Sequence, residues 1–219
     1  MNNQDSFLLD EIEPDVGERI DANVSSAFVK HRALMLTGSV STVLAAAATV
    51  AFGDGGLPRQ VVDVLNYALS LEYFEAAFYE TANRTDGLIP TKYRGLFREI
   101  GEHEAGHVAL LRKALGAAAI RSPDFDFTAG GKYADVFSNF KTFSTLSSTI
   151  EDTGVAAFKG QIANLAGTPV LQTALQIHSV EARHAGSVRL LVGKSGSDGA
   201  FDKPMSKSEV LEAVKPFFR

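Results

Sequence analysis

Apolar residues recur every three or four positions in two segments of the first half of the chain, which is the spacing of an amphipathic α-helix. The pattern predicts helices over residues 58–83 and about 91–115, with Pro58 in the first turn of the first helix and Gly116 just beyond the second. The turn between them, residues 85–90, contains Asp-Gly and Pro and is short. We therefore expect the two helices to be antiparallel neighbours.

The helical pattern lapses over residues 117–134 and returns in two further segments, about 135–166 and 169–192. The lapse is long enough for a crossover between two helical hairpins, whereas the connection at Gly167 is short. Residues 206–209 read Ser-Lys-Ser-Glu, a capping-box pattern that predicts one more short helix. The expected fold is all-α: an antiparallel four-helix bundle with one long crossover between helices two and three, and a short C-terminal helix.

Each of the four predicted helices carries an acidic residue where its apolar stripe should contain an aliphatic one. Burial of an unpaired carboxylate costs several kcal/mol, so these carboxylates must be protonated, paired or bound to metal ions. Two divalent cations would neutralise all four charges at once. The four residues are Glu72, Glu104, Glu151 and Glu181.

Two of these carboxylates are followed three positions later by a histidine, in Glu104-Ala-Gly-His107 and Glu181-Ala-Arg-His184. Residues at i and i+3 share a helix face, so each pair can direct a carboxylate and an imidazole to one point. One such pair alone is more often part of a solvated helix face than a metal site. Two pairs, with one further carboxylate on each of the other two helices, predict a site for two metal ions at one level of the bundle.

The composition restricts the metals and the partners. The chain of 219 residues contains no cysteine, so a metal must be held by carboxylates and imidazoles, which suit Fe, Mn and Zn. The formal net charge is -5 and no basic stripe is visible, which argues against a dedicated nucleic-acid-binding protein. We divide the chain into an N-terminal extension (1–56), the bundle (57–193) and a C-terminal tail (194–219).

Four stretches around these residues resemble the ferritin-like superfamily, and most closely the ferritin-like domain proteins that include desiccation-related proteins of bacteria and plants. They are LNYALSLEYFEAAFY (65–79), EHEAGH (102–107), IEDTGVAAF (150–158) and VEARH (180–184), within a resemblance over about residues 58–193. The resemblance implies two divalent metal ions, Fe or Mn, in a dimetal-carboxylate bundle. Their expected ligands are Glu72, Glu104, His107, Glu151, Glu181 and His184.

The superfamily includes ferroxidases, peroxidases, manganese catalases and oxygenases. The resemblance therefore implies a dimetal oxidoreductase acting on dioxygen or hydrogen peroxide, with a role in stress or desiccation protection. The alternative is a metal-binding or storage protein without turnover, or a structural stress protein. The expected partners are metal ions, small oxidants and further copies of the chain, in a dimer or larger homo-oligomer.

Four residues near the predicted ligands have alternative interpretations. Glu75 borders the face of the first-helix carboxylate and could exchange roles with it. Tyr79, two helical turns after that carboxylate, could hydrogen-bond a ligand, act as a redox relay or be a plain core tyrosine. His178 is a further candidate ligand, although a core or surface histidine is the favoured interpretation. His103 points away from the ligand face of its helix and is expected to be exposed.

Residues 30–32, Lys-His-Arg, precede an uncharged run over residues 33–52 that is rich in small side chains. This order is typical of an export signal, which would place the protein in the periplasm. The alternative is a retained helix, buried or at an oligomer interface, in a cytoplasmic protein. Membrane contact is expected only if residues 33–52 are retained as an anchor.

Overall fold

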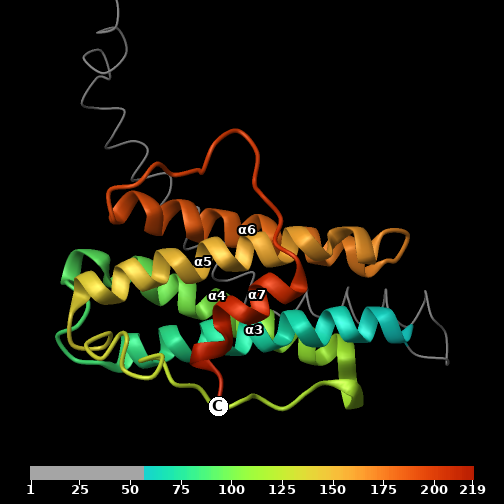
Figure 1. Ribbon diagram of the computed structural model, residues 1–219, viewed down its shortest axis with the longest axis horizontal. Coiled ribbons are helices and arrows are strands. Elements are labelled where there is room, and N and C mark those ends of the chain that lie inside the picture. The colour runs from blue at the N-terminus through green and yellow to red at the C-terminus, as the bar shows by residue number, and fades with distance from the viewer. Residues whose placement is uncertain (1–56) are drawn as a thin grey trace, which may run out of the picture. The chain divides into compact units, whose positions relative to one another are not determined.

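The computed structural model describes residues 57–219, in which every regular element is a helix (Figure 1). The predictions for residues 1–56 lie outside the described residues. The all-α fold predicted from the sequence is confirmed. The α-helices are α3 (Arg59–Arg84), α4 (Arg94–Leu115), α5 (Phe140–Gln161), α6 (Val170–Leu191) and α7 (Lys207–Val214). The short 3-10 helices are η2 (Thr91–Tyr93), η3 (Gly116–Ala118), η4 (Ile162–Leu165) and η5 (Lys215–Phe217).

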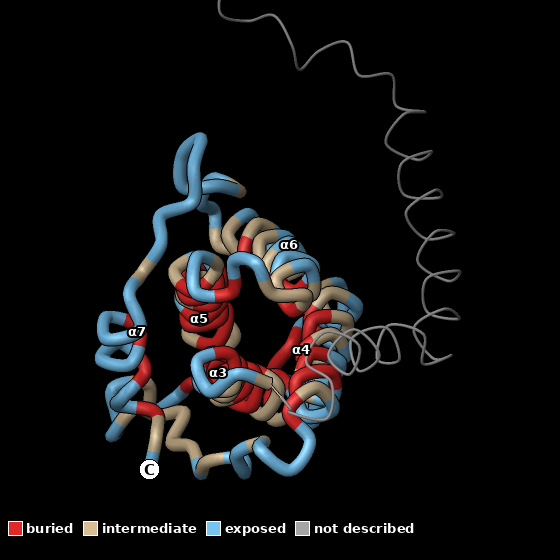
Figure 2. The backbone as a smooth tube through the Cα atoms, turned by 90° about the vertical axis from the view of Figure 1, so that its right-hand side faces the viewer, coloured by how far each residue is buried: buried red, intermediate tan, exposed pale blue. Residues whose placement is uncertain are grey.

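The four long helices form two antiparallel hairpins, in which α3 packs along α4 and α5 packs along α6. Viewed along the helices, their buried faces turn toward one another (Figure 2). This arrangement follows from the apolar stripe that each helix carries on one side. Within residues 57–219, none of the helices is long and apolar enough to span a bilayer.

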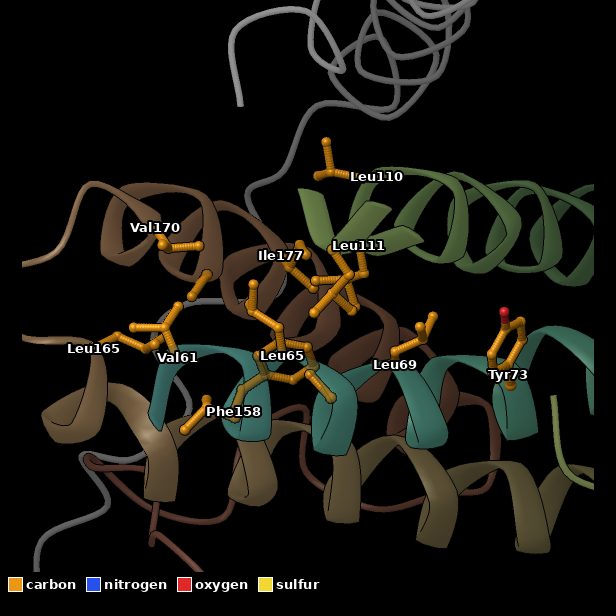
Figure 3. Close-up of a cluster of buried hydrophobic side chains, with 14 residues drawn as sticks. Val61, Leu65, Leu69, Tyr73, Leu110, Leu111, Phe158, Leu165, Val170 and Ile177 are labelled. Atoms are coloured by element: carbon orange, nitrogen blue, oxygen red, sulfur yellow. The ribbon is translucent and has the colours of Figure 1, made fainter. Parts of the chain in front are cut away.

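Two apolar clusters fill the bundle, one toward each end. The first contains Val61 and Leu65 of α3 with Ile177 of α6 (Figure 3), and the second contains Phe78 of α3 with Phe143 of α5. Along each long helix, the buried acidic residues occur where one cluster gives way to the other. The carboxylates therefore form a layer in the middle of the bundle.

The same order of clusters explains the long connection between α4 and α5. Helix α4 ends at the first cluster, with Leu111 and Leu115, whereas α5 begins at the second, with Phe143. The two helices therefore run in the same direction, and residues 119–139 must travel the length of the bundle. Figure 1 shows this segment running beside the helices. The predicted crossover is confirmed.

Helix α5 is shorter than the helix predicted over residues 135–166. It begins at Phe140 because Asn139 caps it: the side-chain oxygen of Asn139 accepts a hydrogen bond from the backbone N–H of Lys141. The amide of the same asparagine donates to the carboxylate of Asp135, at 2.8 Å, and the intervening residues form turns. At its other end α5 tightens into η4. Such side-chain caps compete with helix extension and are not visible in the apolar period.

The C-terminal tail docks on its own bundle. Helix α7 begins with the predicted capping box, in which Ser206 and Glu209 each bond the other's backbone N–H. Two valines of α7 pack against residues of α3 and α5. Beyond α7, the N–H of Asp126 in the crossover donates to the carbonyl of Phe217 at 2.8 Å. The tail is thus tied to both the bundle and the crossover.

Candidate metal centre

The six residues predicted as metal ligands lie together in the middle layer of the bundle. They come from all four long helices and are all buried, the carboxylates completely and the histidines with at most 9% of their surface exposed. The helical period places them there, because each occupies a core-facing position. The set is Glu72 of α3, Glu104 and His107 of α4, Glu151 of α5, and Glu181 and His184 of α6.

The first group of ligand atoms surrounds Nδ1 of His107. This nitrogen lies 2.9 Å from Oε1 of Glu181 and 3.2 Å from Oε2 of both Glu72 and Glu104. The four residues offer one ligand atom each within 4.8 Å of one another. Donors bonded to one metal ion at about 2.0–2.2 Å lie about 3 Å apart, so these spacings fit the edges of a coordination polyhedron.

The second group surrounds Nδ1 of His184. This nitrogen lies 2.8 Å from Oε1 of Glu104, 3.6 Å from Oε2 of Glu151 and 3.7 Å from Oε2 of Glu181. These four residues also offer ligand atoms within 4.8 Å of one another. Glu104 and Glu181 belong to both groups, and each turns one oxygen toward either histidine. They would therefore be shared between the two sites with two metal ions bound.

Several buried polar atoms of the centre have no hydrogen-bond partner among residues 57–219. Nδ1 of His184 and Oε1 of Glu104 are 2.8 Å apart, but their angles do not suit a hydrogen bond and both atoms are left without one. Both oxygens of Glu181 are also unpartnered. Buried polar atoms are nearly always satisfied, so this convergence indicates an arrangement for cations. Carboxylates and neutral imidazoles fit a pair of divalent metal ions.

Without metal, the centre retains protons that balance its charges. Burial, reinforced by neighbouring carboxylates, raises the pKa of Glu72 and Glu151 well above the usual carboxyl range. Burial would also raise the pKa of Glu104, but close contact with both histidines outweighs it and lowers this pKa. Burial would lower the pKa of His184, but contacts with Glu104 and Glu181 outweigh it and raise this pKa to about 11. Metal binding must therefore displace protons from the centre.

Comparison with known proteins identifies the family of this bundle. A family model described as "Ferritin-like domain" matches residues 60–194, which include all six buried residues of the centre. The chain belongs to the ferritin-like domain family. The resemblance seen in the sequence is thereby confirmed. "Protein rds1" of Schizosaccharomyces pombe (strain 972 / ATCC 24843) is 26% identical over 155 residues, which are 71% of this chain and 35% of that protein. The chain thus spans about a third of the length of this relative.

Within the ferritin-like centre, Tyr79 is the hydrogen-bond partner of a predicted ligand. Its side chain is completely buried, and its hydroxyl donates to Oε1 of Glu151. Burial and the nearby carboxylate of Glu151 raise the pKa of Tyr79 above the usual tyrosine range, so the hydroxyl stays a neutral donor. The other oxygen of Glu151 faces His184. Of the interpretations that the sequence leaves open, the geometry therefore favours Tyr79 as a residue that hydrogen-bonds a predicted ligand and orients it.

The structure separates the roles of Glu72 and Glu75. Both are buried, but only Glu72 contributes an atom to a ligand group. Glu75 lies beside Gly154 of α5: a Cβ atom added at Gly154 would be 2.8 Å from Oε1 of Glu75 and 3.8 Å from Oε2 of Glu181. Glu75 is thus next to the centre but outside its two groups.

His178 is not brought into either ligand group. It is half-buried on α6, and its Nδ1 has no hydrogen-bond partner in the described part of the chain. Burial, together with the positive charge of Lys159, lowers its pKa below the usual histidine value. The geometry therefore favours the interpretation of His178 as a residue outside the metal centre.

The expectation that His103 is exposed is wrong. This residue is half-buried, because α6 lies beside α4 at this level, and its Nδ1 is 2.9 Å from Nε2 of His184. Its own Nε2 is 4.0 Å from Oε1 of Glu99. The available sequence signal is the i, i+4 spacing of His103 and His107, which places both on one side of α4.

Proposed function

We propose that this ferritin-like protein is a dimetal oxidoreductase that binds two Fe or Mn ions and acts on dioxygen or hydrogen peroxide. The observation that carries the proposal is the sharing of Glu104 and Glu181 between the two ligand groups. Carboxylates that face both histidines would hold two ions as an adjacent pair rather than as separate sites. Such a pair supplies two electrons, the number that converts hydrogen peroxide and two protons to two molecules of water.

The residues of the chain would bind, orient and shield this pair. His107 and His184 would each bind one ion through Nδ1, because that nitrogen faces the carboxylates in both cases. Tyr79 would hold Glu151 in position through its hydroxyl. The apolar clusters on either side of the layer exclude bulk water, which strengthens electrostatic interactions in the centre.

The proposal is tested on full-length protein purified gently from its native host, by elemental analysis and by assays of peroxide consumption and ferrous-ion oxidation. We expect two Fe or Mn ions per chain, and Glu104→Ala and Glu181→Ala variants that fold but lose metal and activity. Glu102→Ala is the control, because Glu102 is exposed on the same helix as Glu104. Full activity in both ligand variants, or protein without bound metal, would contradict the proposal.

The same samples test the non-catalytic alternative, because the donor set also fits redox-inactive Zn²⁺. Stoichiometric Zn with no turnover would support a structural or metal-binding role. A large hollow assembly in a solution mass measurement would support metal storage. A protective role in stress or desiccation rests on the family resemblance, and loss of survival in cells carrying Glu104→Ala would support it.

A further inference from the structure

A cavity of about 170 Å³ lies next to the metal centre, enclosed by α3, α5, the crossover and the C-terminal segment. Its walls are mainly apolar side chains, including Phe74, Leu146 and Phe217. The lining extends from Lys132, which is exposed, to Glu75, which is buried. The cavity therefore extends from the protein surface to Glu75, which lies beside the centre.

Glu75 is the polar group at the buried end of this cavity. Its exposed fraction is 2%, and its Oε2 has no hydrogen-bond partner among the described residues. It also lies outside both ligand groups. A buried carboxyl group in an apolar wall is costly unless it binds a polar group. Because Glu75 lines the cavity, its carboxyl group is the acceptor that a molecule there would meet.

Gly154 allows the carboxyl group of Glu75 to pack close against α5. It lines the cavity in the interior of α5, where glycine is less favourable than alanine for the helix. A Cβ atom here would approach Oε1 of Glu75 to 2.8 Å and Oε2 of Glu181 to 3.8 Å. The missing side chain therefore makes room for the carboxyl group of Glu75 between the cavity and a predicted ligand.

The size and the walls of the cavity select a class of ligand. A cavity of similar volume in another protein, lined by Leu, Ile and Phe, binds benzene, so about six non-hydrogen atoms fit here. Apolar walls disfavour charged molecules and strongly hydrated ones such as hydrogen peroxide. We propose that the cavity binds a small organic hydroperoxide, with its hydrocarbon group against Phe74 and Leu146 and its O–H donating to Glu75.

This inference rests on the proposed oxidoreductase function and adds organic hydroperoxides to its oxidants. Reduction of a hydroperoxide, ROOH, breaks the O–O bond and takes up two electrons and two protons, giving the alcohol ROH and water. A bound pair of divalent ions would supply the two electrons, and the two protons would come from solvent. Glu75, which the absence of a side chain at Gly154 allows to lie beside the centre, would fix the peroxide end of the molecule there.

Binding is tested without turnover by titrating tert-butanol, an unreactive analogue of tert-butyl hydroperoxide, into full-length protein with labelled methyl groups. We expect saturable NMR shifts for methyl groups in the lining, including Leu146, Ile150 and Val214. Pivalate has the same shape, but it carries a negative charge and lacks an O–H donor. It should bind at least about tenfold more weakly, because its charge would be buried beside Glu75.

A pair of variants shows whether these shifts report the cavity. Thr149→Phe places a ring at an exposed position of the lining and should weaken tert-butanol binding about tenfold or more by filling the space. Thr145→Phe is the matched control, because Thr145 is also exposed, one turn earlier on α5, and does not line the cavity. The control should bind tert-butanol as the unaltered protein does.

Activity of the metal-loaded protein provides a second measurement. Gly154→Ala should lower kcat/KM for tert-butyl hydroperoxide with metal content unchanged, whereas Gly106→Ala, a helical glycine with open space around it, should not. Absence of metal would contradict the proposed function, but the tert-butanol titration would still decide about the cavity. Absence of methyl shifts, equal binding of pivalate, or identical binding by Thr149→Phe and Thr145→Phe would overturn the inference.

Discussion

Nδ1 of His103 lies 2.9 Å from Nε2 of His184, and the two rings are inclined by 13°. A metal ion at Nδ1 of His184 needs the lone pair of that nitrogen, which leaves the ring proton on Nε2. That N–H would donate to Nδ1 of His103, whose own proton would then be on Nε2, toward Glu99. His103 therefore fixes the ring orientation that the second ligand group requires.

Replacing His103 with Leu should weaken binding of one metal ion by about 10–100-fold, the usual cost of losing a hydrogen-bond partner behind a metal ligand. In a calorimetric metal titration, the step that involves His184 should weaken and the step that involves His107 should not. His103→Gln should restore part of the affinity, because the glutamine oxygen accepts the same hydrogen bond. Equal weakening of both steps, with no rescue by Gln, would show a general structural effect instead.

The neighbouring carboxylates of α3 should differ in their effect on metal content. Glu72→Gln removes a member of the first ligand group and should reduce the metal content from two ions to one. Glu75→Gln should leave two ions bound, because Glu75 lies outside both groups. Both side chains keep their volume, so the pair is matched for packing. Elemental analysis that shows the reverse order would exchange the two assignments.

The clustering of the six candidate ligands could be predicted from the sequence because each of the four carboxylates interrupts an apolar stripe. A carboxylate such as Glu151, in the middle of a hydrophobic helix face, is a signal that one helix carries by itself. The spacing of Glu104 and His107 then gives the direction of both side chains. The fold could be predicted from the same helical period of apolar residues. Four apolar helix faces, separated by two short turns and one long connection, restrict the topology.

Other features depend on contacts between helices and could not be predicted from one helix at a time. Glu72 and Glu75 are three residues apart and both buried, but only Glu72 contributes an atom to a ligand group, whereas Glu75 lies against Gly154 of α5. His103 lies at the edge of its stripe, so its burial depends on how closely α6 approaches α4. The start of α5 depends on the Asn139 cap, which the apolar period does not show.

The stability of the metal-free protein should fall as pH rises through the neutral range. Burial raises the pKa of Glu72 and Glu151 well above 4.5, so the folded state keeps protons that the unfolded chain releases above that pH. Contacts with carboxylates, which outweigh burial, raise the pKa of His184 from 6.5 to about 11. This shift also makes the folded state less stable as pH rises. Each proton held only by the folded state lowers the free energy of unfolding by about 1.4 kcal/mol per pH unit.

The pKa shifts also give the pH range over which each group contributes to stability. The stabilisation from the carboxyl groups is complete below pH 4.5 and that from His184 below pH 6.5, and both are lost as pH rises toward the folded-state pKa values. Glu104 acts in the opposite sense, because its pKa is lowered: its contribution is present above pH 4.5 and is lost in acid. Denaturant unfolding between about pH 6.5 and pH 9 should therefore show a falling free energy.

Metal should reverse this trend, because metal ions and protons compete for the same atoms and binding strengthens as pH rises. Unfolding curves of metal-loaded and metal-free protein should therefore diverge toward alkaline pH. Glu72→Gln, which cannot titrate, should flatten the pH dependence of the metal-free form. Parallel curves for the loaded and metal-free forms would show that the buried groups do not exchange protons for metal.

Tyr79→Phe should separate metal binding from activity. The hydroxyl of Tyr79 donates to Glu151 and touches no other predicted ligand through a hydrogen bond, so its removal leaves all six ligands in place. The variant should bind two metal ions with somewhat lower affinity, because Glu151 loses the donor that orients it. Peroxide consumption should fall by about tenfold or more, since small displacements of catalytic groups have large effects on rate.

Tyr73→Phe is the matched control for this change. Tyr73 is buried on the same helix, but its hydroxyl lies 3.4 Å from the carbonyl of Ile120 and makes no contact with the centre. Each variant removes one hydroxyl and its single hydrogen bond, so both should lose about 0.5–1.5 kcal/mol of unfolding free energy. Only Tyr79→Phe should change the ratio of peroxide consumption to bound metal. Equal ratios in the two variants would mean that Tyr79 serves the core alone and does not orient Glu151 for catalysis.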